Sequence, residues 1–126
     1  MFTIGLSRGS HLLLVCSGSP TFDDFLALID LAGAVARREG HDALLVDALG
    51  VPPTFTADQR VELGRYAART LTGRRVALVV PSTFRFDATR AAAAQAGGAL
   101  GYFESHDAAQ AWLAARGRVS VNANLP

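Results

Sequence analysis

A buried parallel strand is predicted by the stretch Leu44-Leu45-Val46-Asp47, which is apolar until it ends in a carboxylate. Strands covered on both faces are typically short apolar runs without polar alternation. Two other runs share this character, Leu12-Leu13-Leu14-Val15-Cys16 before it and Arg75-Val76-Ala77-Leu78-Val79-Val80 after it. Successive runs are about 30 residues apart, the length of a unit in which a helix connects two parallel strands. The spacing therefore indicates a parallel sheet with crossover helices.

Both intervening segments carry helix signals. Thr21 is a predicted N-cap, acidic residues follow it in the first turn, and Gly40 is suited to a left-handed C-cap. Thr56 and Gln59 have the spacing of a capping box, which predicts a second helix over about residues 57–71. In the first helix, apolar residues recur every three or four positions, as expected of a helix packed on a sheet.

The remaining segments complete the architecture. Phe2, Ile4 and Leu6 alternate with small or polar residues before a turn, which predicts an N-terminal hairpin. After the Val76–Val80 strand we expect an alanine-rich helix over about residues 87–96, a strand over 100–103, and a final helix that Ser105 caps and Gly117 ends. The predicted fold class is α/β: a mostly parallel open sheet of about five strands, with an antiparallel N-terminal hairpin, packed by about four helices. We expect one domain over residues 1–116 and a flexible C-terminal tail over 117–126.

Composition narrows the function classes. The chain has 126 residues and a formal net charge of +1, and its 12 basic residues, all Arg, are scattered among 11 acidic ones. This pattern does not favour nucleic-acid binding, which calls for a basic face. No segment approaches the ~20 apolar residues of a membrane span, and the short run before Cys16 fits a lipoprotein signal poorly. We expect a cytoplasmic protein in which Cys16 is a buried small hydrophobe.

The order of elements resembles that of the STAS family of sulfate-transporter and anti-sigma-factor-antagonist domains, especially its short stand-alone bacterial members. Four features carry the resemblance over about residues 1–115: the opening hairpin, the strand ending at Asp47, the Arg75–Val80 strand, and the closing pattern from Tyr102-Phe103-Glu104 to Trp112-Leu113. The resemblance implies a STAS-like fold and a non-enzymatic role, either docking a protein partner or binding a small ligand.

One functional feature of that family is missing. Anti-sigma-factor antagonists carry a phosphorylatable serine in an Asp-Ser-Ser-Gly-like turn, whereas this chain has Asp47-Ala48-Leu49-Gly50. The phosphoswitch therefore cannot be transferred. Thr54 and Thr56 follow closely, but the capping role of Thr56 is a simpler explanation for that hydroxyl.

Open α/β sheets bind ligands beyond the carboxyl ends of their strands. Two loops leave such ends here, and they combine aromatic area, hydroxyl groups and one cation. Arg85 could pair with an anion, while the aromatic rings would supply contact area. The alternative is that Phe84 and Phe86 fill the core and Arg85 points to water. The predicted binding residues are Asp47, Thr54, Phe55, Ser82, Thr83, Phe84, Arg85 and Phe86.

Catalytic and metal sites find little support in the sequence. A phosphoacceptor site like that of a response-regulator receiver would need an acidic pair and a lysine, and the chain has no lysine. His11, His41 and His106 lack a ligand spacing and are interpreted as solvated loop or turn residues, so we expect neither metal nor cofactor. The leading interpretation is a regulatory or protein-interaction module. The alternative is a carrier for a small apolar or anionic molecule or a lipid, and self-association through a sheet edge or the alanine-rich helix remains possible.

Overall fold

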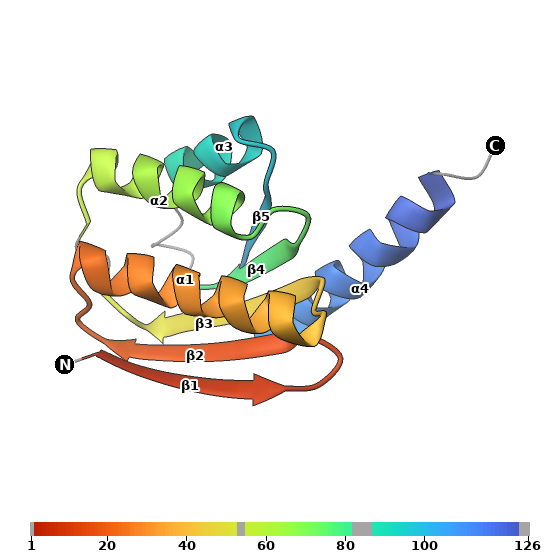
Figure 1. Ribbon diagram of the computed structural model, residues 1–126, viewed down its shortest axis with the longest axis horizontal. Helices are drawn as coiled ribbons and strands as arrows, with labels where there is room; N and C mark the ends of the chain where they lie inside the picture. Colours follow the sequence, from red (N-terminus) through yellow and green to blue (C-terminus); the bar gives the residue numbers. More distant parts are fainter. Residues whose placement is uncertain (1, 53–54, 82–86, 124–126) are drawn as a thin grey trace.

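The computed structural model describes residues 2–52, 55–81 and 87–123, with the side chains of 87–90 and 115–123 excepted. Its strands are β1 (Phe2–Arg8), β2 (Leu12–Gly18), β3 (Ala43–Gly50), β4 (Arg75–Val79) and β5 (Ala99–Phe103). Its helices are α1 (Phe22–Glu39), α2 (Ala57–Thr70), α3 (Asp87–Gln95) and α4 (His106–Ala123). The strands form one sheet in the order β1-β2-β3-β4-β5, where β1 and β2 are antiparallel and each later pair is parallel (Figure 1). The predicted fold class is thus confirmed.

Helices cover the two faces of the sheet unequally. On one face, here called the α1 face, side chains such as Leu14 and Val46 pack against Leu28 and Ala32 of α1 and against residues of α2. On the other, the α4 face, strands β3 and β4 pack against Ala109 and Leu113 of α4. Helix α3 lies mainly against α2 (Figure 1). It also contacts β5.

The local capping signals are confirmed. Thr21 and Asp24 form a reciprocal capping box at the start of α1, as do Thr56 and Gln59 at the start of α2. Gly40 ends α1 at a φ of 73°, in the left-handed region where glycine is favoured. Each signal involves residues at most four positions apart, so the sequence alone specifies it.

Two sequence predictions are wrong: that helices cover β2 on both faces, and that the last helix ends at Gly117. Val15 in β2 is 41% exposed, because α4 mainly covers β3 to β5 on the α4 face. Helix α4 also continues past Gly117 to Ala123 and extends away from the sheet (Figure 1). A glycine within a helix costs only about 1 kcal/mol relative to alanine, so it need not end the helix.

Arg74 and Arg75 bind backbone carbonyl groups in other parts of the chain. Arg74 Nε donates a hydrogen bond to the His41 carbonyl oxygen at 2.9 Å, and Arg75 Nη1 donates to the Leu113 carbonyl oxygen at 3.0 Å. The second bond joins the start of β4 to α4. These arginines therefore connect elements that the chain brings together only after folding.

Candidate functional site

Asp47 lies near the carboxyl end of β3 and points toward the α4 face. Its Oδ2 atom accepts a hydrogen bond from Nε2 of His106, the first residue of α4, at 2.7 Å. Its Oδ1 atom accepts the backbone N–H of Leu49 at 3.0 Å. The Asp47 side chain is only 16% exposed and that of His106 is 37% exposed. Asp47 therefore fixes both the end of its own strand and the start of α4.

His106 lies in the first turn of α4, as predicted, but its partly exposed side chain binds Asp47 and is not merely solvated. The two partners are 59 residues apart, and they meet because α4 lies back across β3 and β4. The predicted cap at Ser105 is correct, since its hydroxyl accepts the backbone N–H of Ala108 at 3.2 Å. A cap beside a histidine, together with an acidic strand end, was the available signal for this pair.

A partly open cavity of about 120 Å³ lies on the α1 face, between α1, α2 and the sheet. Its walls are almost wholly apolar, and Arg60 and Tyr102 are the lining residues with polar side-chain ends. An apolar cavity slightly larger than this one is known to stay dry and to bind benzene. The volume therefore suits an apolar group about the size of one aromatic ring. The lining residues are Phe25, Leu28, Ile29, Ala32, Val46, Ala48, Val51, Pro52, Phe55, Arg60, Leu63, Ala67, Leu71, Val76, Leu78, Val80, Leu100 and Tyr102.

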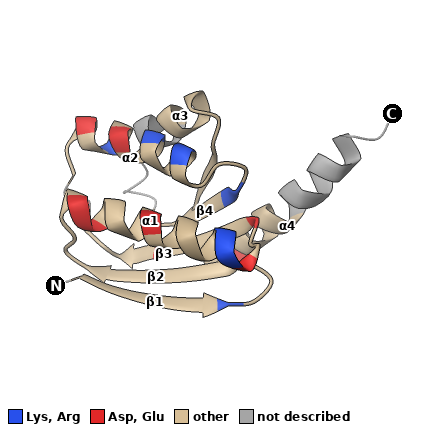
Figure 2. Cartoon of the chain, in the orientation of Figure 1, with Lys and Arg blue, Asp and Glu red and all other residues tan. Residues whose placement is uncertain are grey.

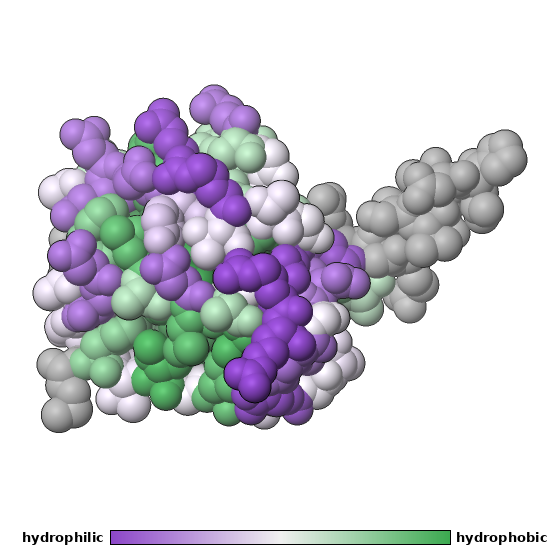
Figure 3. All heavy atoms as spheres, in the orientation of Figure 1, coloured by the Kyte–Doolittle hydropathy of each residue, from purple (hydrophilic) through white to green (hydrophobic). Residues whose placement is uncertain are grey.

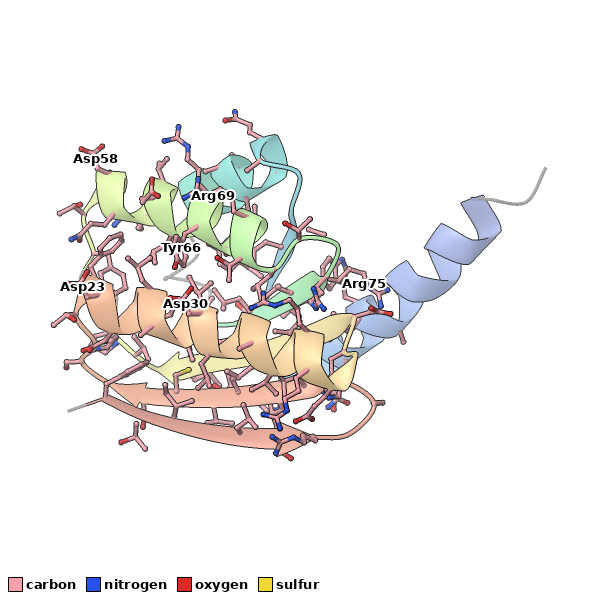
Figure 4. All side chains as sticks on the ribbon, in the orientation of Figure 1. Asp23, Asp30, Asp58, Tyr66, Arg69 and Arg75 are labelled. Carbon is pink, nitrogen blue, oxygen red and sulfur yellow. The ribbon has the colours of Figure 1, made fainter. Side chains whose placement is uncertain are left out.

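Polar contacts between α1 and α2 hold the helices over this cavity. Tyr66 Oη donates a hydrogen bond to Asp30 Oδ1 at 2.6 Å, and Figure 4 shows these two side chains pointing toward one another from α2 and α1. The Asp30 carboxylate is the main cause of a raised pKa for the Tyr66 phenol. Arg37 Nη1 also donates to the Thr70 carbonyl oxygen at 3.4 Å. Hydrogen bonds thus join the two helices that cover the cavity.

An aromatic cluster borders the cavity, which Phe25 and Phe55 line. The rings of Phe22 and Phe25 each meet the ring of Phe55 edge-on, with centroids 6.3 and 5.6 Å apart. Arg60 Nη1 donates to the Phe55 carbonyl oxygen at 2.6 Å. This bond holds one cation next to an apolar wall.

The predicted site residues do not all come together. Phe55 lines the cavity on the α1 face, whereas Asp47 points toward the α4 face, so the sheet separates these two. Thr54, Ser82, Thr83, Phe84, Arg85 and Phe86 lie outside the described residues. Sequence reasoning missed Arg60 and Tyr102, and the apolar residues around them have the ordinary pattern of a core.

Cys16 is a poor candidate for a nucleophile. Its side chain is 1% exposed, and burial, followed by the negative charge of Asp47, raises the pKa of its thiol to about 11. The thiolate needed for nucleophilic attack is therefore scarce at neutral pH. Among the described residues, no group of three or more His, Cys, Asp or Glu side chains could hold a metal ion. None of the described helices combines the length and apolar character that a bilayer crossing requires.

The hairpin, the parallel strands and the four helices define a STAS-like α/β fold, as the sequence resemblance implied. The chain is similar in structure to an uncharacterized protein of the DUF3478 family with a SpoIIAA-like fold, from Shewanella loihica PV-4. The two share 21% sequence identity over 89% of this chain and 93% of the other, with a TM-score of 0.54. No protein-family model matches the chain, and no curated protein matches it.

Proposed function

We propose that the protein is a non-enzymatic binding module whose cavity takes a small molecule with an apolar group. The observation that carries this proposal is the cavity of about 120 Å³ between α1, α2 and the sheet, with its nearly all-apolar walls. Small-molecule sites are typically apolar cavities with a few placed polar groups. Arg60 and Tyr102 are such groups here, and Arg60 favours a ligand with an anionic end.

Octanoate and benzene are suitable probes, since they share apolar character and differ in charge. Isothermal titration calorimetry of the purified chain is expected to show binding of both. An Ala67→Phe substitution places a ring in the cavity and should abolish binding, because its volume is about that of one ring. Ala94→Phe, on the exposed side of α3, is the matched control and should leave binding unchanged.

The charge of Arg60 is tested separately. Arg60→Gln keeps a hydrogen-bond donor but removes the cation, so octanoate should bind about tenfold more weakly while benzene binding is retained. Equal loss of both ligands would instead indicate a structural role for Arg60. If the folded wild-type chain binds neither probe, or if Ala67→Phe binds as well as the wild type, the proposed site is wrong.

A protein-interaction module is the second candidate, and one exposed side chain favours it. Leu49 follows Asp47 at the end of β3 and is 46% exposed, at the position where the STAS resemblance implies partner docking. Leu49→Glu should then prevent capture of a partner from a cell extract, while the folding of the chain stays intact. A cytoplasmic location, expected from the sequence, is part of both proposals.

A further inference from the structure

One flank of α1 carries opposite charges at its two ends and a leucine between them. Asp24, Leu31 and Arg38 follow at intervals of seven residues, so they form one row along the helix. All three are exposed, and Leu31 is 42% exposed. Asp30 on the other flank binds Tyr66 of α2, so the row lies on the side away from α2. Figure 2 shows the acidic first turn and the basic last turn at opposite ends of α1.

The strand at this side of the molecule has an unprotected edge. β1 is the outer strand of the sheet, and in an antiparallel pair half of its main-chain N–H and C=O groups point away from β2. Proline, charged residues and bulges commonly protect such edges. Residues 2–7 contain no proline or charge, and the pairing with β2 has no register shift. Phe2, Ile4 and Leu6 remain half-buried, and Figure 3 shows hydrophobic surface gathered over this region.

The middle of β1 and the middle of α1 lie at the same level. The Phe2 and Phe25 rings stack with centroids 6.2 Å apart, and Arg8 Nε binds both Glu39 carboxylate oxygens at 2.6 and 2.7 Å. With the standard rises, Phe2 lies about 10 Å before Gly5, and Phe25 lies about 9 Å before Leu31. In the other direction, Arg8 lies about 10 Å after Gly5 along β1, and Glu39 lies about 12 Å after Leu31 along α1. Gly5 and Leu31 therefore lie at about the same position along the strand direction, so a single two-fold rotation axis can pass beside both residues.

We propose that a second copy of this chain docks on this edge about a two-fold axis, with β1 antiparallel to the partner's β1 and α1 antiparallel to the partner's α1. The rotation brings Asp24 of each chain to Arg38 of the other and places the two Leu31 side chains together. Ile4 faces the partner's Leu6 across the new strand pair. A two-fold interface needs a self-complementary surface. This edge provides one through opposite charges, an apolar side chain and unpaired main-chain groups of β1.

Sedimentation velocity of the full chain tests the proposal. We expect a dimer for the wild type at about 100 µM and a monomer for Leu31→Glu, which places two carboxylates at the axis. Ala94→Glu is the matched control, because it introduces the same charge at an exposed position on α3, which lies outside the edge. It should remain dimeric. Circular dichroism verifies that both variants fold.

Two more variants test the geometry itself. Arg38→Glu should raise the dimer dissociation constant about tenfold through repulsion of Asp24, while Arg65→Glu, an equal charge change on α2, should not. Gly5→Cys should form a disulfide-linked dimer on oxidation. A Cβ at Gly5 meets only the Val15 carbonyl oxygen, at 3.9 Å, so the substitution fits the fold.

A wild-type chain that stays monomeric overturns the proposal, including one that binds phospholipid vesicles through this edge. A dimer that survives Leu31→Glu and does not cross-link through Gly5→Cys also overturns it, since the interface then lies elsewhere. Octanoate binding in the cavity is a separate measurement, so its failure would not be confused with failure of the dimer.

Discussion

Asp47 shows how one side chain can serve structure at a position where the fold suggests function. Both of its carboxylate oxygens are engaged, one by His106 and the other by the backbone of Leu49. It lies at the carboxyl end of a strand, where ligands often bind in open α/β sheets. The observed bonds instead make it an anchor for α4.

Removing either partner of this bond should destabilise the fold by about 1 kcal/mol, less than the usual value for a hydrogen bond to a charged group, because the pair is partly exposed. We expect similar losses for His106→Ala and Asp47→Asn in urea unfolding, with little further loss in the double variant. Asp107→Asn removes a carboxylate from the same helix turn and serves as the control. Fully additive losses would show that the two side chains do not interact.

Cys16 predicts a dependence of stability on alkaline pH. The unfolded thiol titrates near its ordinary pKa of 9.0, whereas the folded thiol titrates at about 11. Between these values the unfolded state releases a proton that the folded state retains. The free energy of unfolding should therefore fall, by up to about 1.4 kcal/mol per pH unit. Urea titrations of the wild type and Cys16→Val over this range measure the difference, and equal slopes would contradict the prediction.

Residue roles could be predicted from the sequence only where the partners are neighbours. The Thr21 and Thr56 caps were found because their partners follow within one helical turn. The bond from His106 to Asp47 and the bond from Arg75 to the Leu113 carbonyl span 59 and 38 residues. Such pairs depend on how helices and strands meet, which local spacing does not encode.

At the scale of elements, close packing of α2 against the start of β5 depends on Gly98. A Cβ added there would lie 2.9 Å from the Ala68 Cβ atom and 3.1 Å from the Ala93 carbonyl oxygen. Both neighbours are fixed by helices, so neither can move alone. The alanine-rich helix α3 and the small residues of α2 form this seam, which the sequence showed only as a run of small side chains.

Gly98→Ala should lower the free energy of unfolding by about 1 to 3 kcal/mol through overpacking. Adding Ala68→Gly removes the nearest atom and should recover part of the loss, although glycine in a helix itself costs about 1 kcal/mol. Thermal or urea unfolding of the two single variants and the double variant measures this coupling. A Gly98→Ala variant with the free energy of unfolding of the wild type would contradict the prediction, because α2 and α3 would then have moved apart without loss of stability.

The sequence was a better guide to element type than to element surroundings. The apolar stretch from Leu12 to Cys16 correctly predicted a strand, but Val15 is exposed because α4 mainly covers β3 to β5. The pattern around Gly117 predicted a helix end, yet α4 continues to Ala123. The apolar pattern of a segment indicates which side chains can be buried. The helices and strands packed against that segment determine which of them are buried.

At the scale of the whole molecule, the order of strands and helices followed from the sequence because each crossover is local. The cavity did not, since its walls come from α1, α2 and three strands, and its residues look like any core. The hydrophobic pattern of a single segment does not show whether the core around it is completely filled. The proposed ligand site is therefore a property of the packing of the whole chain.

The most direct test of the cavity as a binding site is a crystal structure of the wild-type chain under xenon pressure, because dry apolar cavities take up xenon. We predict a xenon atom between α1, α2 and the sheet, in contact with Ile29, Leu63 and Leu78, and its loss in Ala67→Phe crystals. Side chains filling this space, with no xenon in the wild type, would contradict the account.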